Sequence, residues 1–123
     1  MKSITNEQSD HVEMRFLEGV RNRCPKDSRV LKALGDLYTR TGELEKGLDV
    51  DRNLVRMCPK EPEVWYNLGC SHALVGEKEE AFEALSRAVE LGYSDRDWMS
   101  RDNDLRSIRK DPRFRLLLQQ LRD

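Results

Sequence analysis

Two histidines and three cysteines are the residue types in this 123-residue chain that most often carry nucleophilic or metal chemistry. His72 follows Cys70 by two positions, and such a pair could form a nucleophile with its base or part of a metal site. Residues two apart on a helix point to different faces, so a packing role for His72 is the favoured interpretation. We expect His11 to lie on a helix surface.

Other catalytic patterns are missing from the sequence. It contains no serine nucleophile elbow, no phosphate-binding glycine loop and no HExxH zinc motif. The carboxylates of Glu77, Glu79 and Glu80 fit the first turn of a helix, where negative charge favours the helix dipole, better than they fit a general acid–base pair. A structural zinc site would need four ligands at close spacing. We therefore expect no cofactor, no metal and no catalysis, with an uncharacterised enzyme as an unfavoured alternative.

The composition bounds the class of protein. Lys plus Arg number 22 and Asp plus Glu number 23, which gives a net charge of −1, whereas nucleic-acid binders usually show a basic excess. Segment 94–123 has a net charge of +2, which is only a weak signal. No apolar run approaches the roughly 18 residues of a membrane span, and the first residues lack the apolar core of a secretory signal. We expect a cytoplasmic protein with no nucleic-acid or membrane partner.

The elements that position the chemical groups follow from an internal repeat. When the chain is shifted so that position 24 falls on position 58, one tripeptide, one dipeptide and two single residues coincide: Cys24-Pro25-Lys26 with Cys58-Pro59-Lys60, Leu34-Gly35 with Leu68-Gly69, Gly42 with Gly76 and Glu45 with Glu79. Several matches at one offset indicate a repeated structural unit. We call this offset the repeat length.

Each copy of the repeat predicts a pair of helices. The first helix is predicted by apolar residues at three- and four-residue steps, namely Leu31, Leu34, Leu37 and Tyr38. Gly42 follows where that helix should end, and Pro59 pushes Cys58 away from helical dihedral angles, which ends the second helix. Small residues are expected where the two helices cross closely, at Gly35, Gly47, Gly69 and Ala81.

This pattern resembles the tetratricopeptide repeat (TPR) family, whose unit of about 34 residues carries Trp-x2-Leu-Gly, then Ala-x3 and a large residue, then Pro. The second copy reads Trp65, Leu68, Gly69, Ala81, Leu85 and Ala88; the first reads Leu31, Leu34, Gly35, Tyr38, Gly47, Leu54 and Pro59. Three residues depart from the pattern: Asp51, His72 and Tyr93 stand where the family has a large apolar residue, Tyr and Pro. The resemblance implies an all-α fold, a short TPR-type solenoid of helical hairpins.

We expect a single domain in four parts: an N-terminal helix or half repeat at 1–27, TPR copies at 28–61 and 62–95, and a C-terminal helical cap at 96–123. Leu17 and Val20 lie one repeat length before Asp51 and Leu54, which supports the half repeat. Caps are expected because each repeat unit leaves an apolar face for its neighbour.

Within the predicted cap, residues 104–114 read Asp-Leu-x-x-Ile-Arg-x-Asp-Pro-x-Phe, which resembles the closing segment of bacterial TPR proteins. Asp111 and Pro112 predict a helix N-cap and the first helical position. The following apolar stripe is expected to face the second hairpin and consists of Phe114, Leu117, Leu118 and Leu121.

All three cysteines are expected to be free thiols. Cys24 and Cys58 occupy equivalent repeat positions, about 10 Å or more apart in stacked hairpins and beyond the reach of a disulfide. The odd count and the absence of a CxxC pair favour a reducing compartment.

In TPR proteins the first helix of each pair lines a concave groove that holds extended peptides, and the resemblance implies such a groove here. The expected groove residues are Arg29, Lys32, Asp36, Arg40, Glu63, Tyr66, Asn67 and Cys70. Tyr66 is expected to be an exposed aromatic anchor. Three basic residues against two acidic ones favour a partner that is mildly acidic or carries both signs.

A sharper version of the resemblance concerns TPR domains that hold a terminal carboxylate. Lys32, Asn67 and Arg101 match the residues of such a clamp, but Asp36 and Asp97 replace two other members. Two acidic residues would repel a carboxylate, so this mode is not favoured.

The sequence thus predicts a protein–protein interaction adaptor or scaffold that binds a partner segment in the groove, as a monomer or weak homo-oligomer. The alternative is a self-associating structural module, because imperfectly capped repeat arrays expose apolar end faces.

Overall fold

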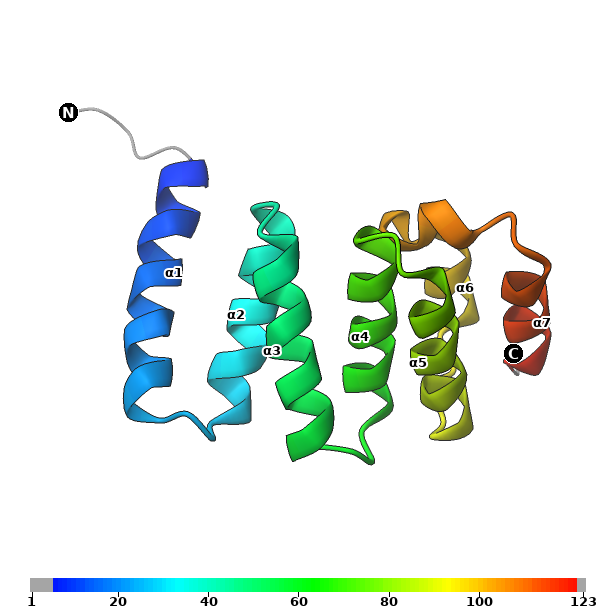
Figure 1. Cartoon of the computed structure of the whole chain (residues 1–123), viewed down its shortest axis with the longest axis horizontal. Coiled ribbons are helices and arrows are strands. Elements are labelled where there is room, and N and C mark those ends of the chain that lie inside the picture. The colour runs from blue at the N-terminus through cyan, green and yellow to red at the C-terminus, as the bar shows by residue number, and fades with distance from the viewer. Residues whose placement is uncertain (1–5, 122–123) are drawn as a thin grey trace.

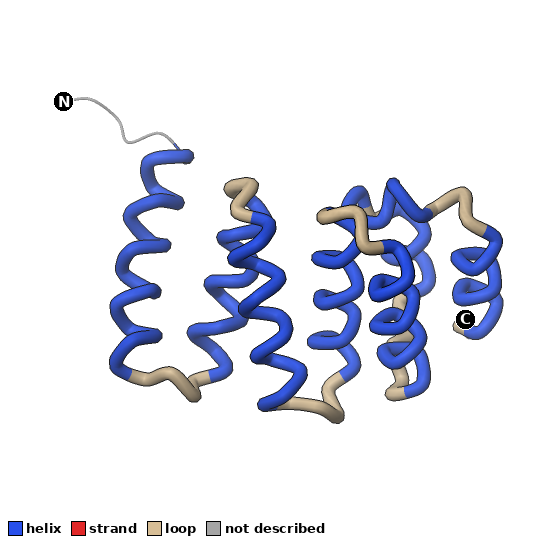
Figure 2. Tube along the Cα trace, in the orientation of Figure 1, coloured by secondary structure: helices blue, strands red, loops and turns tan. Residues whose placement is uncertain are grey.

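The computed structural model describes residues 6–121, and every regular element in that range is a helix (Figure 1; Figure 2). In chain order they are α1 (Asn6–Arg23), α2 (Ser28–Arg40), α3 (Leu44–Met57), α4 (Pro62–Leu74), α5 (Lys78–Glu90), α6 (Arg96–Arg101), the 3₁₀ helix η1 (Asn103–Ile108) and α7 (Pro112–Gln120). The predicted all-α helical solenoid is confirmed. Residues 1–5 and 122–123 of the predicted end segments lie outside the described range. No helix within residues 6–121 is both long and apolar enough to cross a membrane.

Two helical hairpins, α2–α3 and α4–α5, stack through contacts between α3 and α4. Glycines end the first helix of each hairpin: Gly42 has φ 81° and Gly76 has φ 85°, both in the left-handed region. In each turn the next residue closes the helix end, because the N–H of Glu43 donates to the carbonyl of Tyr38 (2.8 Å) and that of Glu77 to His72 (2.9 Å). The two hairpins therefore share one turn geometry at equivalent positions of the repeat.

The glycine inside each first helix lies where the hairpin mate crosses, but the two crossings differ in tightness. A Cβ at Gly69 would lie 2.7 Å from the Leu85 side chain and 3.2 Å from the carbonyl oxygen of Ala81. A Cβ at Gly35 would lie 3.4 Å from Val50 and from the Asp51 carboxylate, which is ordinary contact. Equivalent positions in the two repeats thus make different demands on their glycines.

Alanine substitution at these two positions is expected to have opposite effects. Gly69→Ala should destabilise the chain by about 1–3 kcal/mol, since the methyl group meets a branched carbon of Leu85 and a backbone oxygen. Gly35→Ala should range from neutral to about 1 kcal/mol more stable, because alanine favours the helix. Urea unfolding of both variants measures the difference, and equal effects would contradict the close crossing at Gly69.

The N-terminal helix α1 packs on α2 with one side only. Met14 is buried, and Leu17 and Val20 pack partly buried against the core of the first hairpin. On the other side Val12 and Phe16 are 65% and 66% exposed. The covering role predicted for this helix fits its inner side, while Val12 and Phe16 leave two apolar side chains exposed on its outer side.

The C-terminal segment covers the second hairpin with α6, η1 and α7, and α7 lies at the far end of the chain of helices (Figure 1). The predicted inward stripe is confirmed for Phe114, Leu117 and Leu121, which are buried, while Leu118 packs at its edge. The side chain of Asp111 accepts from the N–H of Arg113, so the predicted N-cap is confirmed as well. Three further core side chains come from α6 and η1: Met99, Leu105 and Ile108, each at most 1% exposed.

Residues 96–108 lie one repeat length after α4, so α6 and η1 occupy the place of a third first helix in the sequence. Asp102 interrupts this helix with extended dihedral angles (φ −65°, ψ 119°) and caps η1 by accepting from the N–H of Asp104. After this break, η1 packs against α4.

Candidate functional site

The eight predicted groove residues divide into an exposed and a buried set. Those exposed along α2 and α4 are Arg29, Lys32, Asp36, Arg40, Glu63 and Asn67. Tyr66 and Cys70 are buried, with 5% and 6% of their surface exposed.

The expectation of an exposed Tyr66 is wrong, because the C-terminal segment covers it. Its ring stacks on Tyr93 with the ring centroids 4.3 Å apart, and its hydroxyl donates to the Asp102 carboxylate at 2.6 Å. Burial is the main reason that the pKa of Tyr66 rises well above its usual value. Tyr66 therefore holds the C-terminal segment against α4, and its ring is not available as an anchor for a partner.

Cys70 belongs to the same buried contact. Its thiol lies 3.7 Å from the Asp102 carboxylate, and burial raises the pKa of the thiol, with Asp102 and Asp104 adding to the rise. The ligand atoms of Cys70, Asp102 and Asp104 lie within 4.8 Å of one another, a spacing that could hold a metal ion. The thiolate that a metal needs is disfavoured here, and Asp102 already accepts from Tyr66 and from the N–H of Asp104. Cys70, Asp102 and Asp104 therefore help to hold the C-terminal segment against α4.

The histidines do not form a site with the cysteines. His72 is buried and its Nδ1 lies 3.2 Å from the Glu77 carboxylate, whereas Cys70 contacts Asp102. His11 lies on the exposed side of α1. Cys24, Cys58 and Cys70 are all free thiols, as the sequence predicts.

The basic residues of the predicted groove are paired with acidic residues, several of them outside the predicted set. Arg29 contacts Asp27 at 3.1 Å, and Lys32 contacts Glu61 at 3.0 Å. Arg40 contacts Asp10 of α1 at 3.0 Å and Asp36 at 3.5 Å. The excess of basic over acidic groups that the sequence indicated is therefore neutralised within the chain.

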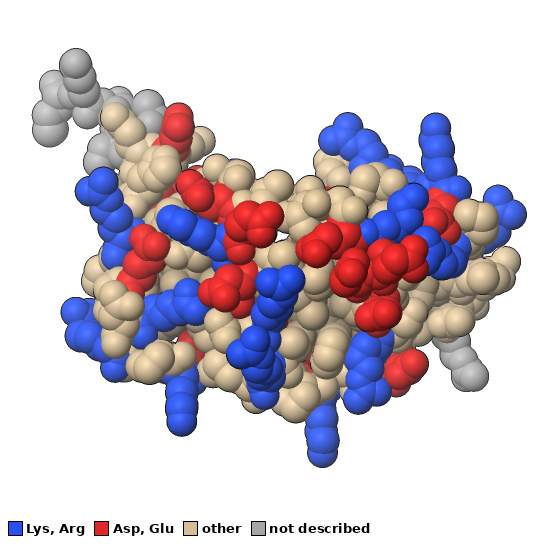
Figure 3. Space-filling model, in the orientation of Figure 1, with Lys and Arg blue, Asp and Glu red and all other residues tan. Residues whose placement is uncertain are grey.

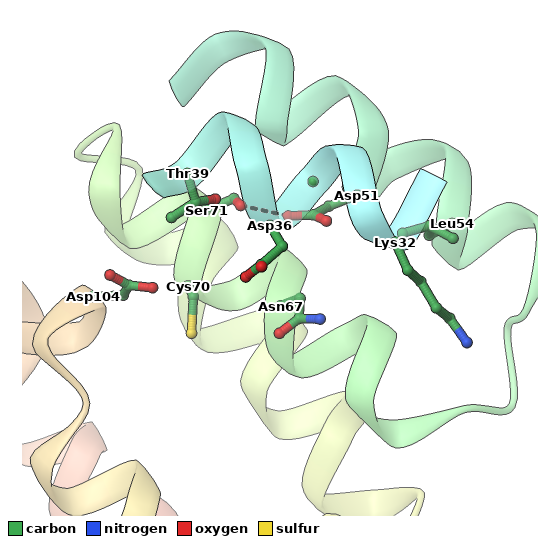
Figure 4. A pocket seen from close by; sticks show the side chains of 10 residues that line it. Lys32, Asp36, Thr39, Asp51, Leu54, Asn67, Cys70, Ser71 and Asp104 are labelled. Atoms are coloured by element: carbon green, nitrogen blue, oxygen red, sulfur yellow. Dashed lines mark hydrogen bonds between the residues drawn. The ribbon is translucent and has the colours of Figure 1, made fainter. Parts of the chain in front are cut away.

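A pocket of about 110 Å³ opens between α2, α3, α4 and η1 (Figure 4). We call it the groove pocket; its lining is Lys32, Gly35, Asp36, Thr39, Asp51, Leu54, Asn67, Cys70, Ser71 and Asp104. Four of the predicted groove residues line it, namely Lys32, Asp36, Asn67 and Cys70. Arg29, Arg40, Glu63 and Tyr66 do not.

Two acidic side chains of the groove pocket escaped the sequence reasoning. Asp104 lies one repeat length after Cys70, which itself lies one repeat length after Asp36, so the three come from matching positions of successive first helices. The same offset, applied once more, would have found Asp104. Asp51 departs from the repeat pattern in the sequence, and in the structure its side chain faces this pocket (Figure 4).

Asp51 is the most unusual charged group in the pocket. It is 5% exposed, and its carboxylate accepts a hydrogen bond from the Ser71 hydroxyl. Burial raises the pKa of Asp51 to about 6, although the hydrogen bond from Ser71 opposes the rise. Equivalent positions in α1 and α5 carry Leu17 and Leu85, so only the copy that faces the pocket has a carboxylate.

The pKa of Asp104 is raised as well. Burial raises its pKa, and the nearby charges of Asp102 and Asp36 add to the rise. Asp36, Asp51 and Asp104 thus give the groove pocket an acidic lining. Chemically, such a lining can bind a cation or donate and accept hydrogen bonds.

The clamp for a terminal carboxylate does not form. Lys32 and Asn67 line the groove pocket, but Arg101 does not. Arg101 lies 3.5 Å from Asp97, and its guanidinium carbon lies 5.7 Å from the centre of the Trp98 ring. The three matched residues therefore do not converge on one site.

Comparison with known proteins agrees with the helical-hairpin architecture. The family model for the tetratricopeptide repeat matches residues 62–94, which hold α4 and α5. The peroxisomal targeting signal receptor of Saccharomyces cerevisiae is 30% identical over 81 residues, which make up 66% of this chain and 13% of the receptor. Residues 62–94 of this chain therefore hold a tetratricopeptide repeat, and the stacked hairpins agree with a solenoid of such repeats.

Proposed function

We propose that this chain is an interaction module that binds a segment of a partner protein along α2, α4 and η1 and catalyses no reaction. The observation that carries the proposal is the groove pocket, whose lining comes from successive elements of the solenoid. Exposed polar side chains such as Asp36 and Asn67 lie on rigid helices there, so little conformational entropy is lost when a partner binds.

Two further observations support this function. Tetratricopeptide repeats act generally in protein–protein interaction, and the related yeast protein is described as a receptor. Acidic and basic side chains lie interspersed on the face drawn in Figure 3, unlike the broad basic surface that nucleic acid requires. We propose that the protein acts in a reducing compartment such as the cytoplasm, which suits its three free thiols.

Self-association is the second candidate function, and the outer side of α1 favours it. Phe16 stands one repeat length before Val50, which is fully buried against Gly35 of the preceding helix α2. No first helix precedes α1 within the described residues, so Val12 and Phe16 stay exposed. A second copy could cover this apolar side, which would make the chain a homo-oligomer.

The groove assignment is tested by selection of a displayed library of random dodecapeptides on the immobilised full chain. We expect Asn67→Trp to weaken the binding of the recovered peptides about tenfold or more, because the tryptophan ring fills the groove at an exposed position of α4. Arg52→Trp, at an exposed position of α3 outside the pocket, is the matched control and should bind like the wild type. Peptides that bind all three proteins equally would place the binding surface elsewhere. If no peptide is recovered and the immobilised chain binds only further copies of itself, self-association is favoured.

A further inference from the structure

The groove pocket presents more negative charge than the chain itself balances. Asp36, Asp51 and Asp104 line it, and the Lys32 ammonium is the one basic group among its lining residues. Lys32 is bonded to Glu61 at 3.0 Å, and in Figure 4 its ammonium group points away from the three carboxylates. Within the described part of the chain, the lining thus has an excess of acidic groups.

Asp51 shows that the acidic groups of the pocket are not all solvated surface side chains. Its side chain is more than nine-tenths buried, and Ser71 is its hydrogen-bond partner; no basic group pairs with it within residues 6–121. A buried carboxylate normally has a charged partner, because the loss of hydration is costly. The repeat register offers leucine at this position, as in Leu17 and Leu85, so the carboxylate is not required for packing.

Asp36 adds charge from α2 and Asp104 adds charge from η1 (Figure 4). Arg40 lies 3.5 Å from Asp36, but its guanidinium also binds Asp10 with two hydrogen bonds, and the Asp36 side chain is 78% exposed. Such an exposed pair contributes little. Both carboxylates therefore remain able to accept hydrogen bonds from a bound group.

We propose that the groove pocket receives a lysine or arginine side chain of the bound partner segment. This inference rests on the proposed function and specifies its partner as a segment with a basic residue, whereas the sequence favoured a partner that is mildly acidic or carries both signs. The pocket volume of about 110 Å³ is several times what one water molecule needs, so it accommodates a side-chain head group. Charge-assisted hydrogen bonds to carboxylates are strongest where water is partly excluded. Asn67 and Thr39 supply neutral polar groups beside them.

The test uses the peptides recovered in the library selection. We expect them to share one Lys or Arg. Replacement of that residue by norleucine, which keeps an aliphatic side chain but removes the charge, should weaken binding at least tenfold. The double variant Asp36→Asn, Asp104→Asn should weaken binding of the basic peptide by a similar factor, and by much more than it weakens binding of the norleucine peptide. Asp97→Asn, on an exposed carboxylate of α6 outside the pocket, is the control and should have no effect.

The outcomes separate this inference from the proposed function. Peptides that need Asn67 but lack a basic residue, or that bind equally with norleucine, overturn the cation pocket and leave the groove in place. Peptides indifferent to Asn67→Trp overturn both. Helical circular dichroism establishes that each variant is folded; if the double variant is not, Asp51→Asn replaces it and should lower the preference for the basic peptide over the norleucine peptide.

Discussion

A chain that ends at Tyr93 is expected to lose its cooperative folded state. Removal of residues 94–123 deletes four side chains that are at most 2% exposed, namely Met99, Leu105, Ile108 and Phe114. Each contributes about 1.5–3 kcal/mol by burial, while a whole domain is stable by only about 5–15 kcal/mol. The deletion also uncovers Tyr66 and Cys70 on α4. Circular dichroism melting and size-exclusion chromatography should show a broad transition and aggregates.

A milder substitution tests the same cap. Leu105→Ala should cost about 2–5 kcal/mol, because it leaves a cavity under η1 where the side chain is fully buried. Leu116→Ala is the control, since this leucine of α7 is 56% exposed and its loss should change stability by about 0.5 kcal/mol or less. A truncated chain that stays monomeric and melts at the same temperature as the full chain would refute the capping role.

Asp51→Asn is expected to stabilise the protein at pH 7 by about 1–3 kcal/mol. The pKa of Asp51 is raised from 3.8 to about 6 in the folded chain, so its ionised form is disfavoured by folding. Well below pH 3.8 the group is protonated in both states and costs nothing; as pH rises from 3.8 through about 6, the folded state loses about 3 kcal/mol of stability. Asparagine has no charge to bury, and its side-chain oxygen can still accept from Ser71.

The measurement is urea unfolding of the wild type and Asp51→Asn at several pH values from 4 to 8. The gain in stability should be small at pH 4 and reach its full size above pH 6. Lys32 and Asp36 from α2 and Asp104 from η1 line the same pocket, so only the difference between the two proteins isolates Asp51. Asp49→Asn, at a 66% exposed side chain of the same helix, should show no such pH-dependent gain. A gain that is equal at pH 4 and pH 7 would contradict the burial of an ionised carboxylate.

Much of the architecture was predictable from local sequence rules. The repeat offset located both hairpins, Gly42 marked the end of a first helix, and Asp111 with Pro112 marked the start of the last helix. These features depend on backbone dihedral angles and nearby hydrogen bonds, which a few neighbouring residues determine. The inward stripe of α7 followed in the same way from helical spacing.

The candidate site was less predictable, because helical spacing gives the direction of a side chain but not what covers it. Tyr66 lies on the expected side of α4. However, it is buried by Tyr93, which follows α5, and by Asp102, which follows α6. Lys32 and Arg40 are on the expected face of α2, but Glu61 and Asp10 neutralise them from other elements. Each of these outcomes depends on a contact between residues distant in sequence.

The sequence by itself determined the two hairpins, the order in which they stack and the start of the last helix, since each depends on the repeat period and on residues within one or two turns. Only the tertiary structure decided the charge of the groove pocket. Asp36, Asp51 and Asp104 lie far apart in the sequence and meet there because the stacking of the hairpins, and the break at Asp102, bring α2, α3 and η1 together. The effective charge of a surface depends on distances and burial across elements, and the period of a single helix carries neither.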